Sequence, residues 1–132
     1  MPNKRDIENR KDIELLVNTF YKKVLSDEVI AYIFTDVAKI NFHEHMPKMY
    51  DFWESTLFQN LVYKGNPMTV HLNLNIMEPL KKQHFDRWLY LFNETVDELF
   101  AGEKAFLAKT RATSIATMMQ TKIHQQNSIS HP

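Results

Sequence analysis

The sequence predicts an all-α fold, and three observations support that class. Glycine is scarce, with two residues in a chain of 132, whereas the chain contains nine Phe, five Tyr, two Trp and seven Met. This composition favours helices around a bulky core over a β-fold with tight turns. Apolar residues recur with helical spacing in several long stretches, and only "LNLNI" at residues 72–76 alternates like a strand. A lone strand would leave its backbone groups unpaired, so helices packed on helices are expected.

Length, charge and cysteine content limit the classes of function. Residues 1–132 are expected to form one domain, with a core over about residues 12–125 and polar flexible ends at 1–10 and 126–132. Sixteen basic and sixteen acidic side chains are interspersed, which favours neither nucleic acid nor an anionic membrane as a partner. The absence of Cys excludes disulfides, thiolate metal sites and a thiol nucleophile. Without an apolar leader or a membrane-length apolar run, we expect a soluble cytoplasmic protein.

The first helix is expected to run from about Ile13, with Asp12 at the N-cap position. Its inward face follows from apolar residues at helical spacing, namely Leu16, Val17, Phe20 and Val24. The helix should end near Ser26. Either Ser26 or Asp27 can cap a short continuation that ends at Phe34.

A second helix is expected in "HMPKMYDFWESTLF", residues 45–58. Its stripe at spacings of three and four consists of His45, Met49, Phe52, Trp53 and Thr56. Trp53 is expected to belong to the core. Pro47 lacks a backbone N–H and clashes with the residue one turn back, so the regular helix begins near Met46 or is distorted at His45.

The second half of the chain contains two more helices. "NLVYKGNP" is expected to be a loop because it contains Gly, Asn and Pro. "EPLKKQHFDRWLYLFNETVDELFAG" is the strongest helical stretch, with Gly102 as its C′ residue and an inward face of Phe85, Trp88, Leu89, Phe92, Val96, Leu99 and Phe100. A last helix should run from about Glu103 to Gln125, with "QNSISHP" fraying beyond it and an inward face of Ala108, Ala112, Ile115, Met119 and Ile123.

Four side chains that carry polar atoms lie on or beside these apolar faces, namely Tyr21, His45, His71 and Trp88. Each alone has a purely structural explanation, since inward His, Tyr and Trp residues are often core residues with satisfied polar atoms. Several chemistries are excluded because the chain has no Glu-x-x-His pair, no His-Glu-x-x-His, no phosphate loop and no nucleophile elbow. A haem site remains, because haem needs only one histidine ligand in an aromatic, Met-lined pocket.

A family resemblance rests on four motifs taken together. "FYKKV", "HMPKMYDFW", "YKGNPMTVHLNL" and "HFDRWLYLF", in this order and at these separations, resemble the truncated haemoglobins, in particular their third group. The resemblance covers about residues 13–125. The first two groups bend the chain around haem with glycine pairs, which this sequence lacks, and the glutamine-rich distal pattern of the first group is also absent.

The resemblance implies a truncated globin-like helical sandwich around haem b and assigns a role to each candidate residue. His71 would be the proximal iron ligand, and Tyr21, His45 and Trp88 would lie on the opposite face of the haem. The residues expected to contact the haem itself are Phe34, Met49, Lys48, Tyr63 and Arg87, with Lys48 the first candidate for pairing with a propionate. The remaining histidines are expected at the surface, namely His43, His84, His124 and His131.

The implied function is reversible binding of dioxygen or another diatomic gas. Two donors on a polarised ligand would slow its release, which suits nitric oxide or peroxide detoxification better than transport. Turnover would require an external reductase, because no flavin or nicotinamide motif is present. An alternative from a different class is a cofactor-free helical interaction module whose aromatic stripes are only core.

Overall fold

The structure is a computed structural model that describes residues 4–59, 63, 65 and 80–130. Its elements are α1 (Arg10–Leu25), the π-helical turn η1 (Ile33–Val37), α2 (Phe42–Phe58), α4 (Lys82–Leu99) and α5 (Glu103–Ser130). Over those residues there are helices and no strands, which confirms the predicted all-α class. The segment "MTVHLNLNIM", with its alternating pattern and His71, lies outside the described residues.

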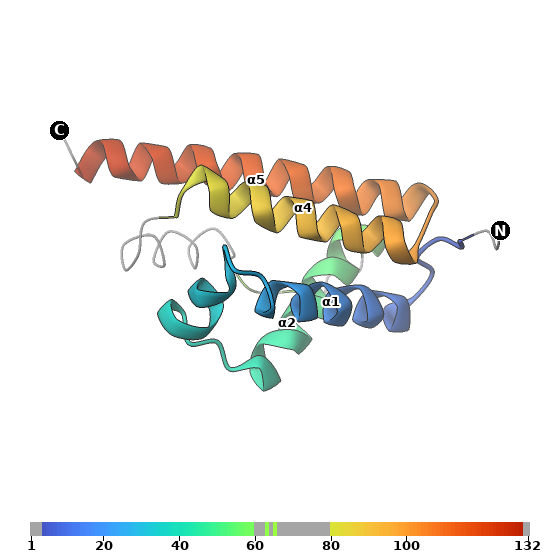
Figure 1. Cartoon of the computed structure of the whole chain (residues 1–132). Helices are drawn as coiled ribbons and strands as arrows, with labels where there is room; N and C mark the ends of the chain where they lie inside the picture. Colours follow the sequence, from blue (N-terminus) through green and yellow to red (C-terminus); the bar gives the residue numbers. More distant parts are fainter. Residues whose placement is uncertain (1–3, 60–62, 64, 66–79, 131–132) are drawn as a thin grey trace.

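The helices form two layers. In Figure 1, α4 and α5 lie side by side as one layer, and α1 and α2 cross beneath them. α1 contacts both α2 and α4, while α2 also reaches α5. The buried side chains between the layers include Phe92 and Val96 of α4, both 0 % exposed. Trp53 of α2 stacks on Phe92 with ring centroids 4.7 Å apart, so its predicted place in the core is confirmed.

α1 begins at Arg10 because Asn9 is its N-cap: the Asn9 side-chain oxygen accepts from the backbone N–H of Asp12 at 3.0 Å. The prediction that Asp12 caps the helix was therefore wrong by three positions. Asp12 is instead buried, where it accepts from the Glu8 backbone N–H at 2.8 Å and pairs with Arg5. The predicted inward face is confirmed, since its members are at most 3 % exposed: Ile13, Leu16, Val17, Phe20 and Val24.

Of the two candidate caps, Ser26 and Asp27, it is Asp27 that caps the turn after α1. Its Oδ2 accepts from the backbone N–H groups of Val29 and Ile30 at 3.1 and 3.2 Å. The chain then enters η1, which contains Phe34.

α2 begins at Phe42, earlier than the predicted start near Met46. The cause is Asn41, whose side-chain oxygen accepts from the backbone N–H of Glu44 at 3.4 Å. Pro47 lies inside the helix. It removes one backbone hydrogen bond, but the turns on either side remain helical.

The N-terminal segment packs onto the junction between α4 and α5. α4 ends at Leu99 with Phe100 as its C-cap, so Gly102 is two residues beyond the cap rather than the predicted C′ residue. Gly102 has φ +142°, and a Cβ there would lie 2.5 Å from the Asp6 Cγ. The buried core also begins before the predicted residue 12, because Ile7 is 2 % exposed.

α5 is longer than predicted and carries the expected inward face. It continues through Ser130 rather than ending near Gln125. Four of the five predicted inward residues are at most 5 % exposed and Ile115 is partly buried: Ala108, Ala112, Ile115, Met119 and Ile123. In the part of the chain that the structure describes, no helix has the length and apolar character to cross a membrane.

Candidate functional site

The candidate site is centred on a polar pair between α1 and α2. Tyr21 lies on the inward face of α1 and is 7 % exposed, and its phenol oxygen is 2.9 Å from Nε2 of His45 in α2. The two rings are nearly perpendicular, with centroids 5.3 Å apart. Because Asn41 starts α2 one turn before His45, the imidazole is directed toward α1. The structure therefore brings together two of the three residues predicted on the distal side.

The protonation of this pair determines which group donates. When Nε2 of His45 carries no proton, the Tyr21 hydroxyl donates to it; when Nε2 is protonated, it donates to the phenol oxygen. Burial raises the pKa of Tyr21, so the phenol keeps its proton at physiological pH. In the arrangement with Nε2 protonated, the neutral phenol therefore keeps its own O–H as a donor to a further acceptor in apolar surroundings.

Aromatic rings from two elements surround the pair. The ring of Phe34 in η1 lies 5.8 Å from that of Tyr21, and Phe42 lies 6.0 Å from Tyr21 and 6.1 Å from His45. Phe42 was not among the predicted site residues. The pattern Asn41-x-x-Glu44 could have placed the start of α2 correctly, and Phe42 would then lie one turn before His45 on the same face.

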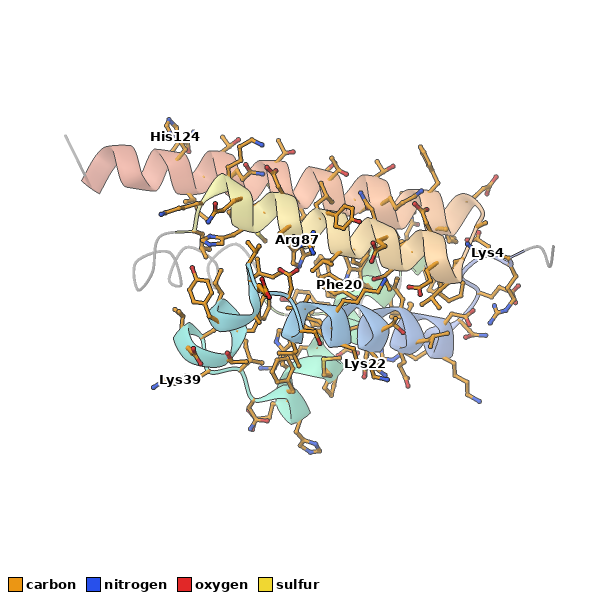
Figure 2. All side chains as sticks on the ribbon, in the orientation of Figure 1. Lys4, Phe20, Lys22, Lys39, Arg87 and His124 are labelled. Carbon is orange, nitrogen blue, oxygen red and sulfur yellow. The ribbon has the colours of Figure 1, made fainter. Side chains whose placement is uncertain are left out.

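Trp88 reaches the pair through an intermediate ring. On α4 it contacts Phe20 edge-on at 5.8 Å, and Phe20 in turn contacts Tyr21 at 5.1 Å. Trp88 also stacks on Phe92, with centroids 5.8 Å apart and planes 10° apart. Figure 2 shows Phe20 between α1 and α4, whereas Lys22 of α1 points away from this contact. Trp88 is partly buried and packs against the same core as Tyr21.

The residues predicted to contact a haem directly lie in different settings. Met49, one turn after His45, is partly buried against the core, and Lys48 is exposed on α2. Tyr63 packs against Phe52 with centroids 5.3 Å apart, and burial raises its pKa. The roles of these three residues toward a cofactor remain predictions.

Arg87 forms an ion pair with Asp27. Its Nε donates to Oδ1 of Asp27 at 2.6 Å, and its guanidinium lies 5.0 Å from the ring centroid of Tyr90. This pair joins α4 to the turn after α1, and Figure 2 shows Arg87 between these two parts of the fold. Its role beside a haem propionate remains a prediction.

The prediction that His84 lies at the surface was wrong. His43 and His124 are exposed as predicted, but His84 is only 6 % exposed. Its Nδ1 accepts from the backbone N–H of Lys81 at the start of α4. Its position one turn before Trp88 on the inward stripe was the available signal. His71 and His131 lie outside the described residues.

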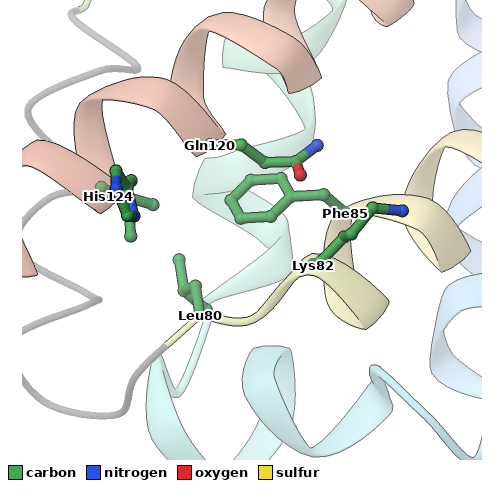
Figure 3. A pocket seen from close by; sticks show the side chains of 6 residues that line it. Leu80, Lys82, Phe85, Gln120 and His124 are labelled. Atoms are coloured by element: carbon green, nitrogen blue, oxygen red, sulfur yellow. The ribbon is translucent and has the colours of Figure 1, made fainter.

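The surroundings of the Tyr21–His45 pair fit a flat, mainly apolar group such as haem. The two rings that contact the pair, and two further residues packed on the same core, each keep some exposed surface: Phe34, Phe42, Met49 and Trp88. Two polar atoms within such a lining suit a small polarised ligand held beside an apolar ring system. A separate cavity of about 220 Å³, lined by Leu80, Phe85 and Ile123 among others, lies between α4 and α5 near the start of α4 (Figure 3).

Comparisons with known proteins identify the family to which the chain belongs. Residues 6–127 match the model of the bacterial-like globin family. The chain is 29% identical over 120 residues to the group 3 truncated hemoglobin of Campylobacter jejuni, covering 89% of this chain and 92% of that protein. The crystal structure of a group III truncated hemoglobin from Campylobacter jejuni matches with a TM-score of 0.79 at 28% identity, over 91% of this chain and 94% of that chain.

Fold and comparisons together define the class as a truncated globin, an all-α fold. The chain belongs to the bacterial-like globin family, and its resemblance to the group III truncated haemoglobins is confirmed. Membership implies a haem cofactor and supports the binding of small gas ligands in general.

Proposed function

We propose that this protein binds dioxygen or another diatomic gas reversibly at haem b, with His71 as the proximal iron ligand. The observation that supports this most is the buried pair of Tyr21 and His45, 2.9 Å apart within a partly exposed aromatic lining. When bound, haem supplies the iron at which the gas binds. The residues of the chain would orient the gas, exclude water and donate hydrogen bonds to it.

The donors favour retention of the ligand. A neutral phenol in apolar surroundings donates to an acceptor with partial negative charge, and such a bond is worth on the order of 1.5 to 3 kcal/mol. Since about 1.4 kcal/mol corresponds to a factor of ten, Tyr21 and Trp88 together would slow release by roughly a hundredfold or more. A protein that releases oxygen this slowly is poorly suited to transport.

We therefore propose more specifically that the protein detoxifies nitric oxide or peroxide in the cytoplasm. An external reductase would be its electron-donating partner. The same donors would stabilise negative charge that develops on the ligand during such chemistry. Stopped-flow mixing of the oxygen-loaded protein with nitric oxide tests this part. Rapid formation of one nitrate per haem would support it, and displacement of oxygen without nitrate would contradict it.

The absorption spectrum of the purified protein tests the binding of haem through His71. Protein purified from haem-sufficient cells should be red with a Soret band, and His71→Ala should lose most of the haem because the iron loses its only proposed protein ligand. His43→Ala, at an exposed position on α2, is the matched control and should keep its haem. Colourless protein that takes up no added haem would contradict the proposal and favour a cofactor-free interaction module.

A further inference from the structure

Both ring nitrogens of His84 are used in hydrogen bonds, and together these bonds determine its tautomer. Nδ1 accepts from the backbone N–H of Lys81 at 2.9 Å, and Nε2 lies 3.1 Å from the hydroxyl of Tyr32. An acceptor nitrogen carries no proton, so the proton of the neutral ring is on Nε2, which donates to the Tyr32 oxygen. The side chain is 6 % exposed, so water cannot easily replace either partner.

These two bonds join segments that are far apart in the sequence. The Lys81 bond closes the first turn of α4, where a backbone N–H would otherwise lack a helical partner. The Tyr32 bond ties that turn to the residue immediately before η1. Trp88 follows His84 by one helical turn, and Phe34 is the second residue of η1. Trp88 thus lies one helical turn from His84, and Phe34 lies two residues from Tyr32.

We propose that His84 is a positioning residue for the candidate site. Its Nε2–H tautomer holds the start of α4 against η1 and so fixes the position of Trp88 relative to Phe34. Both residues pack against the cluster that contains Phe85 and Ile33, so a shift at the start of α4 is transmitted to them through packed side chains. The inference rests on the proposed role of Trp88 as a donor to the bound gas.

Two features of the start of α4 favour a neutral His84 ring. A proton on Nδ1 would face the Lys81 N–H donor, and the positive end of the α4 dipole disfavours a cation in the first turn. Among the described residues, the charged groups on the first turns of α4 include Lys81 and Lys82, with Lys82 paired to Asp86, and Arg87, which is paired to Asp27 after α1. Tyr32 supplies a neutral acceptor, and His124 of α5 lines the cavity beside Lys82 and Phe85.

The tautomer is tested by nitrogen-15 NMR of the histidine side chains in the ferrous protein with carbon monoxide bound. We expect the His84 signals of a neutral ring protonated at Nε2, unchanged in His43→Ala, which serves as an assignment control. A ring protonated at Nδ1 or at both nitrogens would overturn the proposal. This readout does not depend on gas release.

The positioning role is tested by a double-mutant cycle on the rate of dioxygen release. Tyr32→Phe removes one hydrogen bond and keeps the ring, so release should become roughly two- to tenfold faster. Trp88→Phe should also speed release, and the double variant should be no faster than Trp88→Phe alone, because Tyr32 acts through Trp88. Tyr90→Phe, the same change on an exposed side chain of α4, should have no effect.

The cycle separates this inference from the proposed function. If Trp88→Phe speeds release but Tyr32→Phe does not, or if the two effects add fully, the positioning role is wrong and the donor role of Trp88 stands. If Trp88→Phe leaves release unchanged, the donor role is wrong and the positioning inference falls with it. His84→Gln separates the two bonds of His84, because Gln at the third helical position can still accept from the Lys81 N–H. It should preserve the start of α4 yet release oxygen as fast as Tyr32→Phe.

Discussion

Tyr21 carries a phenol oxygen into the interior between α1 and α2, where it meets the imidazole of His45. Spacing along the sequence placed both residues on or beside apolar faces and left the direction of the His45 side chain open, and it did not predict that their polar atoms lie 2.9 Å apart. That distance depends on the start of α2, since a helix beginning near Met46 would leave His45 outside its first turn. A single cap residue, Asn41, therefore sets the geometry of the polar pair.

Removing the phenol oxygen tests the role of Tyr21. Tyr21→Phe keeps the ring that packs on Phe20 and Phe34, so the fold should be retained while dioxygen release becomes about tenfold faster or more. Stopped-flow replacement of oxygen by carbon monoxide measures the rate. Tyr50→Phe removes a phenol that bonds to Asn18 instead and is the matched control. Equal rates in Tyr21→Phe and the parent protein would remove Tyr21 from the distal site.

Among the helices, α5 begins in an unusual way. The backbone N–H groups of its second and third residues, Lys104 and Ala105, donate to the carboxylate of Asp6 at 2.8 Å each. A capping side chain normally comes from the residue just before the helix, but that residue is Gly102. The missing side chain of Gly102 makes room for Asp6. A residue of the segment before α1 thus caps the N-terminus of α5.

Loss of this cap should lower stability measurably. Asp6→Ala is expected to reduce the free energy of unfolding by about 1 kcal/mol, the usual effect of removing a helix cap. Urea unfolding followed by circular dichroism at neutral pH measures the change as a shift of the midpoint. Glu103→Ala is the control, since this exposed acidic residue in the first turn of α5 favours the helix only through its charge. A larger loss for Glu103→Ala than for Asp6→Ala would contradict the capping role.

Across the whole molecule, ion pairs join neighbouring helices both between the layers and within one of them. Lys23 of α1 pairs with Glu94 and Glu98 of α4 at 3.0 and 2.7 Å, and Arg10 of α1 pairs with Asp51 of α2 at 2.8 Å. These side chains are partly exposed, so each pair contributes little to stability alone. The aromatic core between the layers holds them together, and the ion pairs favour one relative orientation of the helices.

Acid should weaken the fold through two carboxylates of the N-terminal region. The hydrogen bond from Arg5 holds the pKa of Asp12 below its ordinary value of 3.8, although burial acts in the opposite direction. Burial also raises the pKa of Asp6, but hydrogen bonds from Lys104, Ala105 and Ile7 outweigh it and leave the pKa lowered. A carboxyl with a lowered pKa in the folded state stabilises the fold above its unfolded pKa and loses that effect as the pH falls through its folded pKa.

The contribution of these two carboxylates to the free energy of unfolding should therefore be nearly constant from about pH 7 to 5 and fall below about pH 4. Urea titrations of the haem-loaded protein at successive pH values measure this dependence. An Asp6→Ala, Asp12→Ala variant is the comparison and should show a shallower fall between about pH 5 and 3, because fewer carboxylates differ between the folded and unfolded states. Equal slopes in the two proteins would show that neither carboxylate contributes.

Residue spacing predicted most of the helices. It failed for residues whose role depends on a partner outside their own helix. The inward faces of α1 and α5 followed from spacing alone, because a residue three or four positions on lies on the same face. Asp12 resembled an N-cap, but Asn9 performs that role, and Asp12 is held by Arg5 instead. His84 resembled a surface residue because its partner Tyr32 is 52 positions away.

The sequence by itself determined the all-α class, the inward faces of the helices and the resemblance to the group III truncated haemoglobins, because these depend on periodicity and on short motifs. Tertiary structure decided which polar atoms meet. Tyr21 and His45 are 24 positions apart, and Asp6 is 98 positions from Lys104, whose helix it caps. Such contacts depend on how whole helices cross, and helix crossing is set by the packing of many side chains at once.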